Sequence, residues 1–412
     1  MHMRILYYTW FENSQEDMEE TLIFLGNGVV KCNIPFEDYE QDQAFTEQLS
    51  KIIEEYACDT IFSFNFFPLI AKTAKSFQIK YISWIYDCPH WTLYSPTAKY
   101  ACNYIFVFDQ VQFLSLKQLE IPHLYHFPLA VNTRRLGGLL KSSRANVSTD
   151  SDDNQSTGIG NGKTLLQGNV EDSPIVSFVG SLYENNRYDQ IQYLPEYLRG
   201  YLEGIIKAQE QIYGYNFISE LLTEDIQKQM NQCIVMELPK SYPVSKQQLY
   251  AAMLNEKVTS QERIFLLNSI SHHYPLTLYT ASNMAIVPRA KNGGTVSYRA
   301  QMPQVFCRSK INLNMTLRSI QSGIPLRALD IMGAGGFLLS NYQTELAEQF
   351  EDGKELVLYG SAEELLDKIS YYLSHEEERQ EIAHCGFLKV QKLFSYETRV
   401  RQMFQLVQEH SF

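Results

Sequence analysis

The fold is decided by residues 311–340, which read Ile311-Asn-Leu-Asn-Met-Thr-Leu-Arg-Ser-Ile-Gln-Ser-Gly-Ile-Pro-Leu-Arg-Ala-Leu-Asp330-Ile-Met-Gly-Ala-Gly-Gly-Phe-Leu-Leu-Ser340. A short apolar run comes first, a loop follows, and a helix with apolar periodicity leads through a glycine turn into a second apolar run. Strand, helix and strand in this order predict a parallel sheet covered by helices. A helix beginning near Pro325 would point free backbone N–H groups at a cleft, where phosphates bind well.

The same alternation extends through the first third of the chain. Apolar runs at 4–9, 60–64, 81–86 and 104–108 predict strands, and the spacing of apolar residues at 45–56 and 68–77 predicts helices between them. Alternating strands and helices imply a parallel sheet with helices on both faces. Residues 1–135 are therefore expected to form one Rossmann-type domain.

A second domain of the same type is expected at 174–394. The polar segment 136–173 would separate the two domains as a linker or insertion, because it is rich in Ser, Asn, Asp and Gly. Apolar helical spacing at 189–270 predicts a helical insertion in the second domain, with Thr259 and Glu262 as a capping box at a helix start. Residues 395–412 are expected to form a last helix that crosses back to the first domain. The predicted fold class is α/β, with two Rossmann-type domains facing a cleft.

Composition excludes several classes of protein. The 412 residues carry 35 basic and 47 acidic side chains, a net charge of −12, which argues against a nucleic-acid partner. Hydrophobic residues at 45% favour a folded chain over a disordered one. No apolar run reaches the ~18 residues of a membrane span, although a peripheral membrane contact stays open. The start is too short for a signal peptide, and seven scattered cysteines without metal-site spacing indicate a cytoplasmic protein.

Several motifs resemble the CgeB-like (spore maturation) glycosyltransferase family of the GT-B superfamily. They are Val176-Ser-Phe-Val-Gly-Ser-Leu-Tyr183, Ser309-Lys-Ile-Asn-Leu-Asn314, Gly323-Ile-Pro-Leu-Arg-Ala-Leu-Asp-Ile-Met-Gly-Ala-Gly-Gly336 and Phe350-Glu-Asp-Gly-Lys-Glu-Leu-Val357, with Trp84-Ile-Tyr-Asp-Cys-Pro89 in the first domain. The resemblance implies a nucleotide-sugar donor, such as a UDP-sugar, in the second domain and an acceptor in the first. It also implies transfer without a metal or a bound cofactor.

The expected donor site draws on both the residues and the resemblance. Asp330 could accept the hydroxyls of a ribose, Arg318 and Arg327 could grip an anion, and the backbone at Gly180 and Ser181 is implied to contact the diphosphate. The ordinary alternative is a tight glycine turn with solvated arginines. The expected donor-binding residues are Gly180, Ser181, Tyr298, Lys310, Asn312, Asn314, Arg318, Arg327, Asp330, Gly335 and Gly336.

One position departs from the related retaining glycosyltransferases, which carry two glutamates separated by seven residues. Asp330 stands at the second acidic position, but Ser322 stands at the first. The carboxylate that the resemblance assigns to the donor sugar is therefore missing, which leaves open whether the anomeric centre inverts and whether the chain has full activity.

The acceptor side is expected in the first domain. Asp87 and His90 follow the strand at 81–86, at the sheet edge where ligands of open α/β sheets gather, and either could take the proton of an acceptor hydroxyl. Asn65 occupies a corresponding position after the strand at 60–64. The acceptor could be a glycan, a protein or a lipid. Two rival functions remain: a sugar-nucleotide epimerase or hydrolase of the same fold, and a carbohydrate-binding surface-assembly protein without turnover.

Overall fold

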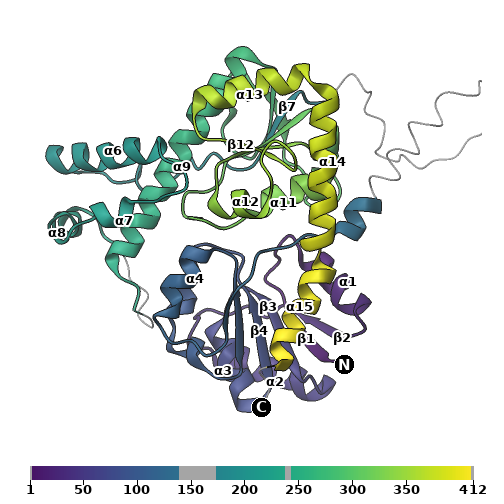
Figure 1. Ribbon diagram of the computed structural model, residues 1–412. Coiled ribbons are helices and arrows are strands. Elements are labelled where there is room, and N and C mark those ends of the chain that lie inside the picture. Colours follow the sequence, from purple (N-terminus) through teal and green to yellow (C-terminus); the bar gives the residue numbers. More distant parts are fainter. Residues whose placement is uncertain (1, 139–172, 237–242, 410–412) are drawn as a thin grey trace, which may run out of the picture.

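The computed structural model describes residues 2–138, 173–236 and 243–409 and shows two α/β domains, one above the other in Figure 1. Most of the expected polar segment 136–173 lies outside the described residues. No helix within the described ranges is both long enough and apolar enough to cross a membrane.

The first domain is built on a six-stranded parallel sheet in the order β2-β1-β3-β4-β5-β6. β3 is buried along its whole length, as expected for a strand covered on both faces. The strands are β1 (Arg4–Tyr8), β2 (Gly28–Cys32), β3 (Thr60–Phe64), β4 (Lys80–Trp84), β5 (Asn103–Val107) and β6 (Leu124–His126). The helices are α1 (Gln15–Phe24), α2 (Gln43–Tyr56), α3 (Pro68–Phe77) and α4 (Gln110–Lys117), with 3-10 turns η1 (Trp91–Tyr94) and η2 (Pro96–Lys99).

The second domain repeats this plan with the sheet order β12-β11-β10-β7-β8-β9, again all parallel. Its strands are β7 (Val176–Val179), β8 (Leu276–Tyr279), β9 (Lys291–Gly294), β10 (Ile311–Asn314), β11 (Leu338–Asn341) and β12 (Val357–Tyr359). Its covering elements are η4 (Met284–Ile286), α10 (Met302–Arg308), α11 (Leu326–Gly333), α12 (Thr344–Gln349), α13 (Ala362–Ser374) and α14 (Glu376–Leu393). The predicted α/β fold with two Rossmann-like domains is confirmed.

The helical insertion stands out from the second domain at the left of Figure 1. It contains α6 (Glu196–Glu210), α7 (Ile218–Leu221), α8 (Glu224–Cys233) and α9 (Lys246–His273), which enclose a small apolar core of their own. The sequence placed a helix start at Thr259, whereas α9 begins with the capping box of Ser245 and Gln248 and runs on without a break. Thr259 is buried inside α9, where its hydroxyl donates to the Asn255 carbonyl instead of capping a helix.

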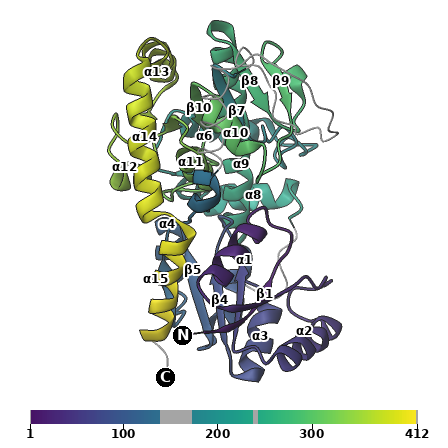
Figure 2. The ribbon, with the colours of Figure 1, turned by 90° about the vertical axis from the view of Figure 1, so that its right-hand side faces the viewer.

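The last helix, α15 (Tyr396–Glu409), leaves the second domain after α14 and lies along the first domain (Figures 1 and 2). Two backbone hydrogen bonds fix the crossing, from Val131 N to the Phe394 carbonyl and from Tyr396 N to the Val131 carbonyl, both 3.0 Å. One apolar core continues from β5 of the first domain to α11 of the second and includes Val400 and Met403 of α15. The two domains thus share buried apolar surface instead of being joined by the chain alone.

Candidate functional site

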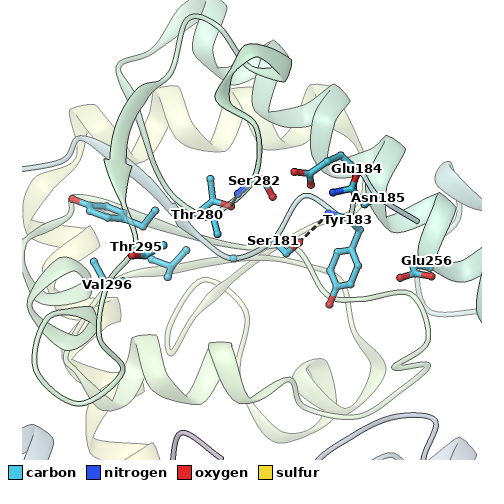
Figure 3. A pocket seen from close by; sticks show the side chains of 13 residues that line it. Ser181, Tyr183, Glu184, Asn185, Glu256, Thr280, Ser282, Thr295 and Val296 are labelled. Atoms are coloured by element: carbon cyan, nitrogen blue, oxygen red, sulfur yellow. Dashed lines mark hydrogen bonds between the residues drawn. The ribbon is translucent and has the colours of Figure 1, made fainter. Parts of the chain in front are cut away.

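A pocket of about 490 Å³ opens at the carboxyl ends of β7 and β8 in the second domain, beside the segment that follows β9 (Figure 3). This edge of a parallel sheet is where open α/β folds bind ligands. The lining side chains are mostly hydroxyls, carboxylates and an amide, with tyrosine rings among them. The lining residues are Val179, Gly180, Ser181, Tyr183, Glu184, Asn185, Glu256, Tyr279, Thr280, Ala281, Ser282, Thr295 and Val296.

Gly180 ends β7 at the floor of the pocket. Its amide donates to the Tyr279 carbonyl at 3.1 Å, and a Cβ at this position would lie 3.2 Å from the Phe178 ring. A side chain at position 180 would crowd the Phe178 ring, so close packing under the turn favours a glycine here. The structure thus places Gly180 and Ser181 in the pocket wall.

Arg263 of α9 lies beneath this turn, although it belongs to none of the motifs in the sequence that indicated a site. Its Nη1 donates to the Ser181 carbonyl at 2.7 Å, and its Nε donates to the Met315 carbonyl at 3.1 Å. The side chain is buried, and no carboxylate among the described residues forms an ion pair with it. Burial lowers the pKa of the guanidinium, and the charge of Arg327 acts in the same direction, whereas the charge of the neighbouring Glu262 raises it. A positive charge therefore lies under the turn at Gly180 and Ser181.

Two carboxylates face the same pocket, Glu184 and Glu256 (Figure 3). Burial raises the pKa of Glu184, but hydrogen bonds outweigh it and hold the pKa below its usual value, including one from Asn283 N at 2.9 Å. Glu256 has a buried Oε2 without a hydrogen-bond partner, and Arg187 Nε lies 3.7 Å from that oxygen. Both side chains line the pocket, and carboxylate oxygens can accept hydroxyls of a ligand.

Asp330, in α11, forms contacts with two other residues that were expected to bind the nucleotide-sugar donor, Tyr298 and Arg327. The Tyr298 hydroxyl donates to Oδ1 at 3.0 Å, and Arg327 Nη1 lies 3.2 Å from Oδ2. Burial raises the pKa of Asp330 to about 6, although Arg327 and Tyr298 favour the charged form. None of these three residues lines the pocket, although Tyr298 follows the lining residue Val296 by two positions.

The turn before α11, residues 321–323, was expected to bind phosphate through its backbone amides, but its surroundings do not fit such a site. The backbone amides of Gln321, Ser322 and Gly323 all donate to Oδ2 of Asp109, at 2.8, 2.8 and 3.0 Å. Asp109 belongs to the first domain, so these amides already bind a carboxylate of the protein itself. Ser322 stands where related retaining glycosyltransferases were expected to carry their first glutamate. Its hydroxyl donates to Glu345 Oε1 at 2.9 Å, so this position also lies at the contact between the two domains.

Arg318 also differs from its expected role. Its Nε donates to Glu262 Oε2 at 2.7 Å, its Nη1 donates to the Ile212 carbonyl at 2.8 Å, and its guanidinium lies 4.2 Å from the centre of the Tyr213 ring. Arg318 is buried, and these partners accept the hydrogen bonds of its guanidinium. The side chain therefore joins the insertion to the second domain and is not placed to bind an anionic ligand.

The remaining expected donor residues lie inside the sheet or at its far edge. Asn312 and Asn314 are buried in β10, where Asn312 bonds Ser177 and Asn314 bonds Ser340. Lys310 precedes β10, at the amino edge of the sheet and away from the pocket. Gly335 and Gly336 form the turn into β11 at that same edge, where a Cβ on Gly336 would lie 2.6 Å from the Phe306 carbonyl. Tight packing explains Gly336, and a positive φ of 72° explains Gly335, without a ligand in either case.

The three expected acceptor-side residues come together in the first domain. Asn65 Nδ2 donates to Asp87 Oδ2 at 2.8 Å, and Asn65 Oδ1 accepts from the amides of Tyr86 and Asp87. The Phe66 amide donates to His90 Nε2 at 3.0 Å, and the Thr92 hydroxyl lies 2.7 Å from the same nitrogen. Burial lowers the pKa of His90, in keeping with a neutral ring.

This acceptor-side group borders the second domain. The Ser319 hydroxyl donates to the Cys88 carbonyl at 2.6 Å, next to Asp87 in the chain. Asp87 itself is exposed, so its carboxylate is accessible from solvent. Within the described residues no group of three or more potential metal-ligating side chains is found.

A known protein family matches part of the chain, and solved structures share its fold. Residues 262–405 match the model of a family described as "Glycosyl transferase-like". No curated protein sequence matches the chain.

Solved structures with little sequence identity share the architecture. A glycosyltransferase from Rickettsia africae ESF-5 superposes with a TM-score of 0.50 at 11% identity, over 99% of this chain and 98% of that one. Sucrose-phosphate synthase from Thermosynechococcus elongatus gives a TM-score of 0.50 at 12% identity, over 98% of each chain. The chain therefore has the two-domain fold of these proteins, and its second half resembles a glycosyltransferase domain.

Proposed function

We propose that this protein is a GT-B glycosyltransferase of the CgeB-like family that takes a sugar from a nucleoside diphosphate, such as UDP. The observation that carries the proposal is the pocket at the carboxyl edge of β7 and β8, where a bare backbone turn at Gly180 lies over the buried cation Arg263. The glycosyl transferase-like match over 262–405 covers part of this pocket.

The pocket has the groups that a nucleotide sugar needs. Its volume of about 490 Å³ suits a ligand of that size, and Glu184 and Glu256 can accept hydroxyls of a ribose or a sugar. Arg263 and Arg327 supply positive charge for a leaving diphosphate, so we propose transfer without a metal ion. Asp330, held by Tyr298, orients the donor from the side of α11.

The acceptor would be activated from the first domain. Asn65 fixes Asp87 Oδ2, which leaves Oδ1 to take the proton of an acceptor hydroxyl as the sugar is transferred. His90 is held neutral and anchors the 87–90 segment through the Phe66 amide. The acceptor is a glycan, a protein or a lipid. All seven cysteines are free thiols, which supports a cytoplasmic location.

Binding of the donor tests the proposal first. A panel of nucleotide sugars is screened by ligand-observed NMR with the wild type and with the Glu256→Gln and Glu377→Gln variants. Glu256 faces the pocket, whereas Glu377 is exposed at the start of α14. We expect one class of nucleotide sugar to bind the wild type and Glu377→Gln alike and to bind Glu256→Gln more weakly. Absence of binding by every nucleotide sugar would refute the proposal.

Turnover of the identified donor then separates the possible activities. Transfer to an acceptor supports the proposal. Donor hydrolysis or epimerisation without a glycosylated product would favour the rival enzyme class, and binding without turnover would favour a carbohydrate-binding protein.

A further inference from the structure

The Asp109 carboxylate of the first domain accepts hydrogen bonds from three backbone amides of the second domain. Asp109 follows β5 and caps α4, with Oδ1 accepting from Gln112 N at 2.7 Å. Its Oδ2 accepts from the amides of Gln321, Ser322 and Gly323 in the other domain. The side chain is fully buried. A charged acceptor that bonds several amides makes a strong and directional contact.

The backbones also fit closely at this point. A Cβ on Gly323 would lie 2.9 Å from the Phe108 ring and 3.0 Å from the Asp109 Cα. Residue 323 must therefore be a glycine if the turn is to touch the end of β5. The contact depends on both sides: a carboxylate on the first domain and a bare turn on the second.

A second carboxylate crosses the junction in the opposite direction. Glu345 of the second domain accepts from Gln110 N at 2.9 Å and lies 2.9 Å from His126 Nε2, both of the first domain. It also accepts the Ser322 hydroxyl, so it supports the turn that holds Asp109. The two carboxylates form a reciprocal contact at the start of α4, where Asp109 is the N-cap and Glu345 accepts from the first residue of the helix.

We propose that Asp109 and the amides of residues 321–323 form a latch that holds the two domains in the present orientation. Separation of the domains at this junction removes three hydrogen bonds at once and leaves both a carboxylate and three amides to be solvated. The latch therefore sets how far the second domain can turn away from the acceptor side. This inference concerns the junction and does not depend on what the pocket binds.

The latch is tested by hydrogen exchange in Asp109→Ser. Serine still caps α4, because serine is a preferred N-cap residue, but its shorter side chain does not reach the turn. We expect peptides covering 318–325 to exchange about tenfold faster or more, since the opening of that turn loses charged hydrogen bonds. Peptides covering 113–117, whose amides bond within α4, should exchange at the wild-type rate.

Asp42→Ser is the matched control. Asp42 also caps a helix, with Oδ1 accepting from Phe45 N at 2.9 Å, and its Oδ2 accepts from Glu37 N at 3.1 Å. All of these partners belong to the first domain, so 318–325 should keep its wild-type protection. Equal exchange of 318–325 in Asp109→Ser and Asp42→Ser would overturn the latch.

Gly323→Ala approaches the same contact from the second domain and remains informative if Asp109→Ser does not fold. Its added methyl group is expected to push the turn from Phe108, with faster exchange at 318–325 and a broader distribution of interatomic distances in small-angle X-ray scattering. Wild-type exchange and scattering in Gly323→Ala would show that the domains do not depend on this contact.

Discussion

The Tyr298 hydroxyl donates a 3.0 Å hydrogen bond to Oδ1 of Asp330, a buried carboxylate in α11. Arg327 lies on the other oxygen of Asp330 at 3.2 Å. Burial nevertheless raises the pKa of Asp330 to about 6, so this carboxylate gains a proton within an accessible pH range. Charge at Asp330 is therefore both a feature of the proposed donor site and a cost to folding.

Donor affinity should depend on the ionisation of Asp330. Above pH 6 the carboxylate is charged and can accept donor hydroxyls, and below pH 6 it is protonated. We expect wild-type affinity to fall as the pH is lowered from 7.5 to 5. Asp330→Asn should weaken binding at pH 7.5 by about 1–3 kcal/mol and should show little change across this range. Calorimetric titration at several pH values measures both, and parallel profiles for the two proteins would exclude Asp330 from the site.

The same substitution should stabilise the folded chain. Because the pKa of Asp330 is higher in the folded than in the unfolded state, its contribution to stability is present below pH 4 and is lost as the pH rises through 6. A rise from 3.8 to about 6 corresponds to roughly 3 kcal/mol. Asp330→Asn is expected to raise the unfolding free energy at pH 7.5 by part of this amount, as measured by urea unfolding. A loss of stability at that pH would show that ionised Asp330 is favourable to the fold.

Arg263 should contribute to diphosphate binding through its charge. We expect Arg263→Gln to lower the affinity for a nucleoside diphosphate by about 10- to 100-fold, because a charged partner contributes about 1.5–3 kcal/mol. Arg379→Gln is the matched control, since Arg379 is likewise buried and donates to backbone carbonyls, those of Tyr372 and Lys310, away from the pocket. Equal affinities in the two variants, measured by calorimetry, would mean that Arg263 only supports the turn at Ser181.

The alternation of strands and helices could be predicted because it depends on local pattern. A strand buried on both faces must be apolar along its length, as Thr60–Phe64 is, and helices carry their own start signals. The strand Lys291–Gly294 has neither property and was missed. It pairs with β8, and Gly293 leaves room for the Tyr279 ring, which would lie 2.5 Å from a Cβ. This strand therefore depends on pairing with β8, which is its neighbour in the sheet but not in the local sequence pattern.

The site was predicted less completely because charge partners are set by tertiary contacts. The sequence favoured Arg318, which lies beside the glycine turn, over Arg263, which lies inside a helix. In the structure Glu262 neutralises Arg318 across 56 positions, whereas Arg263, next to Glu262 in α9, is left without a carboxylate. Likewise, nothing within residues 311–340 indicates that Asp109 occupies the turn. Asp330 and Arg327 are one helical turn apart in the sequence, but nothing in the sequence indicates that the Tyr298 hydroxyl bonds Asp330.

The Arg318–Glu262 pair should matter for stability and not for ligand binding. Arg318→Met leaves Glu262 buried with only the Tyr213 hydroxyl as a side-chain donor, at 2.7 Å, so we expect a loss of about 3–5 kcal/mol of unfolding free energy. Replacing both residues with Met and Leu should cost less, because no unpaired charge remains. Urea unfolding gives the free energies. A large drop in donor affinity of folded Arg318→Met would restore Arg318 to the binding site.

The domain junction should weaken at alkaline pH through His126. Burial lowers the pKa of His126, but the hydrogen bond and the charge of Glu345 outweigh it and raise the pKa above 6.5. The stabilisation is therefore fully present below pH 6.5 and is lost as the pH rises through the folded value. We expect the unfolding free energy to fall between pH 6.5 and 8.5, and less so in His126→Gln. His272→Gln, at the exposed end of α9, should follow the wild type. An unchanged pH dependence in His126→Gln would contradict the assignment.

Asp87 should affect transfer and not donor binding. Its Oδ2 is held by Asn65 at 2.8 Å and its carboxylate is exposed on the first domain, whereas the pocket belongs to the second. A positioned general base typically contributes 10²- to 10⁴-fold to the rate, and Asp87→Asn keeps the shape but accepts a proton poorly. We expect wild-type donor affinity by NMR and a transfer rate about 100-fold lower or more. Asp38→Asn, another carboxylate of the first domain that accepts backbone amides, should leave both values unchanged. A wild-type transfer rate in Asp87→Asn would exclude Asp87 as the base, and the neighbouring His90 would be the next residue to replace.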